Sequence, residues 1–212
     1  MESEPEKEDP WNVVICGVGG QGNVLASQIL ASAAVREGFI VTVGETYGAS
    51  QRGGSVQSHV RFSRRERYGP LIPKGMAHVI LGFEPVEMLR VLAELGSRRT
   101  RVIVNPRPIY PIEVLAGDAE YPEVEEILGR ARRLAAEVKV VEATEIAREV
   151  GDTLVQNMVM VGCLVGDGLV PVRADAVEDA IREHFEGKEG YELNLRAFRE
   201  GVKRIKEAKT LR

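Results

Sequence analysis

The sequence predicts a three-layer α/β fold with a mostly parallel, mixed central sheet and a helical C-terminal portion. Residues 12–16 are an apolar run, a glycine-rich turn follows at residues 17–22, and apolar residues then recur at helical spacing until Gly38. A second apolar run at residues 39–43 completes a strand–turn–helix–strand unit. Such a unit opens the doubly wound sheets of Rossmann-like proteins.

The middle of the chain continues this sheet. Residues 45–55 are expected to form a polar, glycine-rich loop, and residues 56–62 then alternate as in a strand, with Gln57, His59 and Arg61 on its polar face. Residues 77–83 and 101–105 predict two further strands. Pro85 begins a helix that runs to about residue 95, because proline is favourable in a first helical turn.

Beyond residue 123 the pattern is mainly helical. A short strand is expected at residues 138–141 and helices at residues 144–150, 175–185 and 191–209. Residues 153–165 are apolar on nearly all sides, which indicates a helix buried in the core or against a partner. We expect residues 1–10 to be a flexible tail and residues 11–212 to be a single domain.

Composition excludes several classes of protein. The net charge of −4 argues against a nucleic-acid binder, which usually has a strongly basic face. No stretch reaches the roughly 18 apolar residues of a membrane helix, and the acidic N-terminus lacks a signal peptide's apolar core. Cys16 and Cys163 lie in apolar runs, which favours buried free thiols and a reducing, cytoplasmic location. Two cysteines cannot supply an ordinary four-thiolate iron–sulfur cluster.

The first candidate site is the turn between the first strand and the first helix. Gly17, Gly19 and Gly22 have the GxGxxG spacing that lets a backbone approach a phosphate at a helix N-terminus. Glu45 follows the second strand, where a ribose-binding acid would lie. A tight strand–helix turn without any ligand has the same spacing. No Walker lysine is present, which argues against nucleoside triphosphate hydrolysis.

The second candidate site is the loop that follows. Arg52 offers a planar fork for a phosphate or carboxylate, and Gly53 and Gly54 allow an anion-binding concavity. Ser50 and Gln51 add short polar contacts. The alternative is a flexible surface loop with a solvated arginine.

These motifs carry a family resemblance. Gly17-Val18-Gly19-Gly20-Gln21-Gly22, Gln51-Arg52-Gly53-Gly54 and Ser58-His59-Val60-Arg61 together resemble the gamma subunit of 2-oxoacid:ferredoxin oxidoreductases. The resemblance spans roughly residues 11–205, and further matching segments are Phe83-Glu84-Pro85, Asn105-Pro106, Asn157-Met158-Val159-Met160 and Asn194 with Ala197 and Gly201. The glutamine before Arg52 is most similar to the indolepyruvate branch, since pyruvate- and 2-oxoglutarate-type loops tend to carry glutamate there.

The resemblance implies a multi-subunit enzyme. In this family a 2-oxoacid is decarboxylated on thiamine diphosphate, electrons pass through iron–sulfur clusters to ferredoxin, and an acyl-CoA is released. We therefore expect a large partner subunit that carries thiamine diphosphate, magnesium and the clusters, with this chain inactive alone and helping to bind CoA. A homodimer is a further option for the isolated chain. No metal site is expected on this chain and its catalytic residues are not identified; the cofactor-binding candidates are Gly17, Gly19, Gly20, Gln21, Gly22, Glu45, Gln51, Arg52, Gly53, Gly54 and Asn105.

One motif imitates a thiamine diphosphate site. Gly166-Asp167-Gly168 followed by Asn194 matches the spacing of residues that would hold magnesium through hard oxygen ligands. The motif follows an apolar helix rather than a strand, so we interpret it as a helix C-terminal glycine and a surface turn.

His59 is expected to be a structural or solvent-facing histidine. A basic run follows it, and we expect this run to form either a solvated hairpin tip or a contact to an acidic partner or to the phosphates of CoA; its members are Arg61, Arg64, Arg65 and Arg67.

Two other functions remain open. The first is an autonomous Rossmann-like NAD(P)- or flavin-binding oxidoreductase, which rests on the glycine turn and Glu45. The second is a purely structural subunit whose loops only contact other subunits.

Overall fold

The computed structural model describes residues 8–48 and 53–210, apart from the side chains of residues 209 and 210. Its centre is a six-stranded sheet in the order β2-β3-β1-β4-β5-β6. The pairs β1–β4, β4–β5 and β5–β6 are parallel, whereas β3 is antiparallel to both β1 and β2, so β3 alone runs against the other described strands. This arrangement confirms the mostly parallel, mixed sheet. The strands are β1 (Trp11–Val18), β2 (Ile40–Tyr47), β3 (Ser55–Ser63), β4 (Val79–Gly82), β5 (Arg101–Val104) and β6 (Glu137–Val140).

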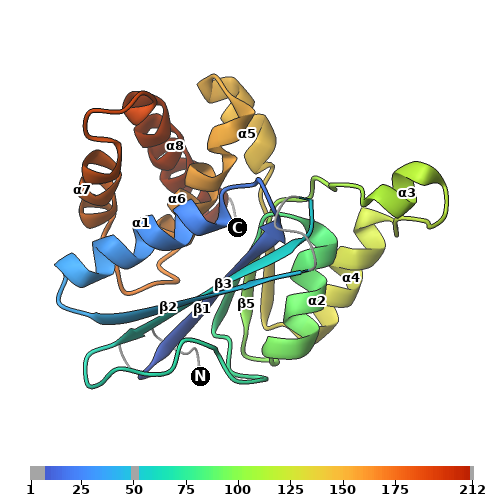
Figure 1. Cartoon of the computed structure of the whole chain (residues 1–212), viewed down its shortest axis with the longest axis horizontal. Coiled ribbons are helices and arrows are strands. Elements are labelled where there is room, and N and C mark those ends of the chain that lie inside the picture. The colour runs from blue at the N-terminus through green and yellow to red at the C-terminus, as the bar shows by residue number, and fades with distance from the viewer. Residues whose placement is uncertain (1–7, 49–52, 211–212) are drawn as a thin grey trace.

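Helices cover both faces of the sheet (Figure 1). One face packs against α2 and α4, and the other packs against α1 and the C-terminal helices. Neighbouring residues of β1 point into opposite cores, Val13 and Ile15 into one and Val14 into the other, which explains why this strand is apolar throughout. The helices are α1 (Asn23–Arg36), α2 (Pro85–Leu95), α3 (Ile112–Ala116), α4 (Val124–Leu134), α5 (Ala143–Val150), the 3-10 turn η1 (Thr153–Val155), α6 (Gln156–Gly166), α7 (Ala174–Phe185) and α8 (Tyr191–Thr210).

The apolar helix α6 lies in the core and crosses α8 at very short range. A Cβ atom on Gly162 would lie 2.1 Å from the carbonyl oxygen of Phe198, and one on Gly201 would lie 2.1 Å from that of Val159. The thiol of Cys163 donates to the carbonyl of Gly201 at 3.4 Å. Glycine on both helices therefore sets how closely these two backbones pack.

The β2–β3 hairpin is longer than the sequence suggested. The expected strand at residues 39–43 extends to Tyr47, which pairs with Val56 of β3, so residues 45–47 and 55 of the expected loop belong to strands. Glu45 consequently lies within β2 and not after it. The cause is the antiparallel ladder, which satisfies the backbone of the polar residues as well as of the apolar ones.

The polar face expected on β3 is buried. Residues 64–78 fold across it, and His59 accepts a hydrogen bond through Nδ1 from the amide of Ile72 at 3.2 Å. Arg61 donates to Asn12 Oδ1 at 3.0 Å and to the carbonyl of Gly69 at 2.8 Å. The expectation of a solvated or ligand-facing Arg61 was therefore wrong, while Arg64, Arg65 and Arg67 are exposed. His59 is structural, and its burial lowers the pKa of the imidazole.

The start of the described chain is tied to the domain. His78 Nε2 lies 2.5 Å from a carboxylate oxygen of Glu8, and Asp9 accepts hydrogen bonds from the Ser63 hydroxyl at 2.8 Å and the Arg64 amide at 2.9 Å. Of the tail expected over residues 1–10, Glu8 and Asp9 therefore contact the folded domain. Across residues 8–48 and 53–210, no helix combines the length and apolar character needed to cross a membrane.

Candidate functional site

The candidate site lies at the edge of the sheet where the parallel strands end. The chain leaves β1 toward α1 on one face and leaves β4 toward α2 on the other (Figure 1). Adjacent strands whose connections diverge in this way form a switch point, and ligands of doubly wound proteins bind in the crevice there. The glycine-rich turn at residues 17–22 and the glycines Gly53 and Gly54 of the second motif both lie at this edge.

The first glycine loop is held in shape by Gln21. Its side-chain oxygen accepts from the amide of Val18 at 2.7 Å, and its amide group donates to the carbonyl of Phe83 at 2.9 Å. A Cβ atom on Gly17 would lie 2.5 Å from that side-chain oxygen, so Gly17 makes room for the brace. Gln21 is thus engaged within the fold, and the exposed Gly20 presents the open face of the loop.

The second glycine loop is hydrogen-bonded to the first. The amide of Gly19 donates to the carbonyl of Gly54 at 2.8 Å, and the amide of Gly53 donates to the carbonyl of Gly19 at 3.3 Å. These bonds extend the antiparallel ladder of β1 and β3, whose last pair is Val18 with Ser55. The sheet therefore brings together two motifs that lie more than thirty residues apart in sequence. Gln51 and Arg52 lie outside the described residues.

The N-terminus of α1 opens onto these loops. Gly22 is the N-cap with a left-handed φ of 82°, and it makes no side-chain cap hydrogen bond. A Cβ atom there would lie 2.3 Å from the side-chain nitrogen of Asn157, which reaches the Gly22 carbonyl at 3.4 Å. The first turn of α1 carries no acidic residue. An uncapped helix start with a positive dipole end favours an anionic ligand.

Glu45 stands apart from this cluster. Its carboxylate accepts from Ser27 of α1 at 3.1 Å and from Tyr47 at 2.8 Å. Because β3 lies between β1 and β2, Glu45 is two strands away from the glycine loop, roughly 10 Å at the usual strand spacing. The inserted strand β3 takes the place beside β1 where a ribose-binding acid would be expected, and the assignment of Glu45 to a cofactor stays a prediction.

Asn105 joins the cluster from the end of β5. The side chain is buried, and its amide group donates to Thr144 Oγ1 at 3.0 Å and to Gln156 Oε1 at 3.2 Å. Its own oxygen, like that of the buried Asn23, has no hydrogen-bond partner among the described residues. Thr144, Gln156 and Asn23 were missed by the sequence reasoning, although polar residues at the start of apolar helices were a usable signal.

A buried carboxylate lies beside the loops. Glu84 caps α2 by accepting from the amide of Glu87 at 2.8 Å, and it also accepts a hydrogen bond from the hydroxyl of Tyr121. Burial raises the pKa of Glu84. Burial, and then the charges of Glu87 and Glu84, raise the pKa of the Cys16 thiol. Cys16 is therefore a protonated core residue and no nucleophile at neutral pH.

Among the described residues, the motif that imitates a thiamine diphosphate site does not form one. Gly166, the residue before Asp167, packs against Ile205 on α8. Ile205 is eleven residues beyond Asn194, so Asn194 lies about 16 Å away along the same helix. Asp167 and Asn194 therefore cannot hold one ion. Gly168 has the expected left-handed φ of 72°, but Asp167 is buried and pairs with Lys139 at 2.5 Å, so the expectation of a surface turn was wrong there. The described residues contain no group of three metal-ligating side chains.

The two cysteines are also unsuited to a cluster. Cys16 and Cys163 belong to the cores on opposite faces of the sheet, and both are free and buried, as expected. Burial raises the pKa of Cys163 to about 12.

What remains at the sheet edge is a candidate binding site. It combines two hydrogen-bonded glycine loops, an uncapped helix start and buried amide side chains. It contains no paired nucleophile and base among the described residues, since Cys16 is buried and protonated and His59 lies beneath residues 64–78.

A doubly wound sheet with paired glycine loops at its switch point defines a class of α/β proteins that bind anionic cofactors or assemble around them. Comparison with known proteins narrows the class: the chain belongs to the family described as pyruvate ferredoxin/flavodoxin oxidoreductase, which matches residues 12–204. Indolepyruvate oxidoreductase subunit IorB of Archaeoglobus fulgidus is 45% identical over 90% of this chain and 92% of its own. The Pyrococcus horikoshii protein of the same name is 41% identical over 93% of this chain and 96% of its own.

Solved structures agree on the fold. The gamma subunit of keto/oxoacid ferredoxin oxidoreductase from Geobacter sulfurreducens matches with a TM-score of 0.67 and 23% identity, covering 93% of this chain and 99% of that one. Pyruvate oxidoreductase subunit PORC from Thermotoga maritima matches with a TM-score of 0.65 and 25% identity, covering 92% of this chain and 97% of that one.

Proposed function

We propose that this chain is a non-autonomous subunit of a 2-oxoacid:ferredoxin oxidoreductase that acts on indolepyruvate or another aryl pyruvate. The reaction converts the 2-oxoacid, CoA and two oxidised ferredoxins into an acyl-CoA, carbon dioxide, one proton and two reduced ferredoxins. A large partner subunit carries the thiamine diphosphate, magnesium and iron–sulfur clusters, and the complex works in the cytoplasm. The 45% identity to an indolepyruvate oxidoreductase subunit supports the substrate class.

Within the complex, the paired glycine loops bind the phosphates of CoA. The observation that carries this proposal is the pair of hydrogen bonds that joins Gly19 to Gly53 and Gly54 in front of the start of α1. CoA is a polyanion, and the uncapped, positive end of α1 beside the joined loops suits its phosphates. Arg52 precedes Gly53 directly and supplies a cation with a planar fork.

The experiment compares the isolated chain with the reconstituted complex. The isolated chain should oxidise no 2-oxoacid with any electron acceptor, and activity should appear when the large subunit is added. In that complex Arg52→Ala should raise the apparent KM for CoA about tenfold while leaving the KM for the 2-oxoacid unchanged, as expected for loss of one charge-assisted contact. Arg133→Ala, at an exposed position in the last turn of α4, is the matched control. Turnover by the isolated chain, or equal CoA kinetics of the two variants, would overturn the proposal.

The alternative of an autonomous NAD(P)- or flavin-binding enzyme has less support. Its acidic residue, Glu45, lies on β2 with β3 between it and the glycine loop. Titration of the isolated chain with NADH, with flavin and with CoA separates the two cases, and tight binding of NADH or flavin alone would favour the alternative. A purely structural subunit would show no change in CoA kinetics on substitution of Arg52.

A further inference from the structure

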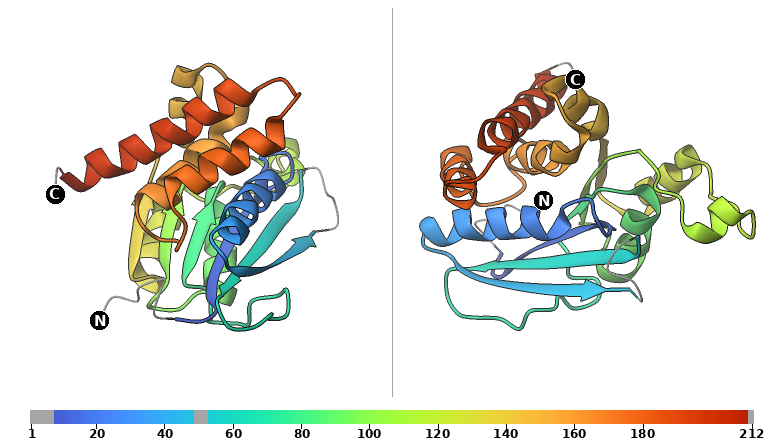
Figure 2. Two further views of the ribbon diagram at one scale, coloured as in Figure 1. Left: turned by 90° about the vertical axis from the view of Figure 1, so that its left-hand side faces the viewer. Right: turned by 45° about the horizontal axis from the view of Figure 1, so that its top comes forward.

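An arm made of residues 106–123 leaves the sheet edge directly after Asn105. It contains α3 and returns to the chain at the start of α4. In Figure 1 and in the right-hand view of Figure 2, α3 stands away from the rest of the described chain. The arm thus projects from the edge that carries the glycine loops.

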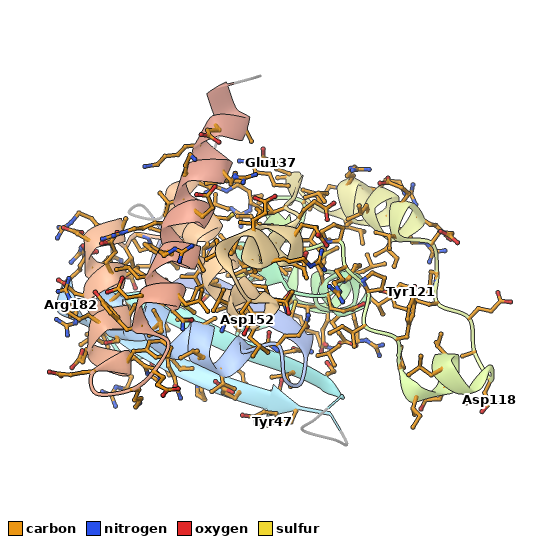
Figure 3. All side chains as sticks on the ribbon, turned by 90° about the horizontal axis from the view of Figure 1, so that it is seen from above. Tyr47, Asp118, Tyr121, Glu137, Asp152 and Arg182 are labelled. Carbon is orange, nitrogen blue, oxygen red and sulfur yellow. The ribbon has the colours of Figure 1, made fainter. Side chains whose placement is uncertain are left out.

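The root of the arm is fixed. The hydroxyl of Tyr121 donates to Glu84, which lies next to the Phe83 carbonyl that holds the first glycine loop through Gln21. The ring of Tyr110 packs edge-on against Tyr121 with centroids 5.2 Å apart. Figure 3 shows Tyr121 between the arm and the body and Asp118 at the arm's far end. The tip is therefore carried on an anchored support.

The tip exposes apolar side chains that its own fold does not use. None of the residues of α3 is buried. Ile112 is 76% exposed and Leu115 is 73% exposed, and Leu154 is 75% exposed on η1, two residues before the Gln156 that contacts Asn105. These three are the most exposed large apolar side chains of the described residues. Ile112 and Leu115 lie one helical turn apart on α3, and an exposed apolar pair of this kind marks an interaction surface.

The negative charge of the arm indicates what kind of surface it can bind. Residues 106–123 contain four acids, Glu113, Asp118, Glu120 and Glu123, and one arginine, Arg107, at the root of the arm, so four negative charges stand against one positive charge. Two such arms would repel each other in a contact between copies of this chain. A partner surface with an apolar floor and a basic rim would complement both features.

We infer that the arm docks Ile112 and Leu115 into an apolar socket, rimmed by lysine and arginine, on the large subunit of the oxidoreductase. This inference rests on the proposed function. It deepens that function by assigning the contact that joins the subunits to a particular segment, which is anchored beside the glycine loops.

The test measures affinity between the purified chain and its own thiamine diphosphate- and cluster-bearing large subunit by titration calorimetry. Ile112→Asp combined with Leu115→Asp should raise the Kd at least about 30-fold, since each is a central apolar anchor. Val35→Asp, at a 58% exposed position at the end of α1, should leave the Kd unchanged. Neither arm position is buried in the free chain, so the thermal unfolding midpoint should not fall.

A charge-reversal variant gives a second, independent readout. Glu113→Lys with Asp118→Lys should slow association about tenfold at low salt and reduce its dependence on ionic strength. If the wild-type chain does not bind the large subunit, the proposed function and the docking both fail. If the wild type binds and both arm variants bind equally well, only the docking fails. Loss of wild-type self-association in the arm variants, with unchanged binding to the large subunit, would assign the arm to a homodimer and overturn the proposal.

Discussion

Replacing Gly201 with alanine should destabilise the chain, because the crossing of α6 and α8 leaves no room for a methyl group. The added Cβ would lie 2.1 Å from the carbonyl oxygen of Val159 and 3.1 Å from the amide nitrogen of Cys163. Both atoms belong to the backbone of α6, so the helices must separate by roughly 1 Å to restore ordinary contact. Overpacking of this kind costs about 3 kcal/mol, and the better helix propensity of alanine returns about 1 kcal/mol. The net loss is about 2 kcal/mol, or a fall of roughly 4–8 °C in Tm.

The assay is urea denaturation followed by circular dichroism, with the free energy of unfolding extrapolated to water. Gly129→Ala is the matched control, since Gly129 lies in α4 with no atom within 4 Å of its added Cβ. Alanine should stabilise the chain there by about 0.5–1 kcal/mol. If Gly201→Ala were as stable as the wild type, the close packing of α6 on α8 would be refuted.

Three further predictions follow from buried polar groups. Gln21→Leu removes the side-chain hydrogen bonds to the amide of Val18 and the carbonyl of Phe83 and leaves both backbone groups unpaired. The free energy of unfolding should therefore fall by about 2 kcal/mol in urea denaturation. Burial raises the pKa of Glu84, so its stabilising contribution is complete below the ordinary pKa near 4.5 and is lost as pH rises through the raised value. Between about pH 4 and pH 8 the wild type should therefore lose more stability than Glu84→Gln, as measured by urea midpoints. Cys16 and Cys163 should not react with a thiol reagent in the native protein and should both react in guanidinium.

The first two of these predictions have a control variant within the chain. Gln28→Leu, at an exposed position on α1, should leave the unfolding free energy nearly unchanged. Glu113→Gln, on the exposed arm, should leave the pH dependence of stability as in the wild type. A parallel pH profile for Glu84→Gln and wild type would contradict the raised pKa, and rapid native labelling of either thiol would contradict its burial.

Local features of the fold could be predicted from the sequence because their causes are local. The helix expected from Pro85 to about residue 95 is α2 (Pro85–Leu95), since Glu84 caps it and proline suits its first turn. The apolar run at residues 153–165 becomes η1 and α6, buried on all sides for its central residues.

Strand order could not be predicted, because it depends on pairing between distant segments. The insertion of β3 between β2 and β1 moved Glu45 away from the glycine loop and brought Gly53 and Gly54 onto it. The same topology buried His59 and Arg61 beneath residues 64–78, which periodicity had assigned to a polar face. The short helix α3 was missed because three prolines around it suggested an open segment.

The reversed direction of β3 has a consequence for how the site can vary. A parallel strand contributes one loop to this edge of the sheet, and that loop must also carry the crossover to the next strand. The end of β2 and the start of β3 instead meet here as a closed hairpin, with Gly48 bonded to Ser55 at 2.8 Å. Its tip can change in length or sequence without shifting the register of any other strand. The connection between β2 and β3, whose Gly53 and Gly54 contact the first glycine loop, can therefore differ between related subunits while the rest of the sheet stays the same.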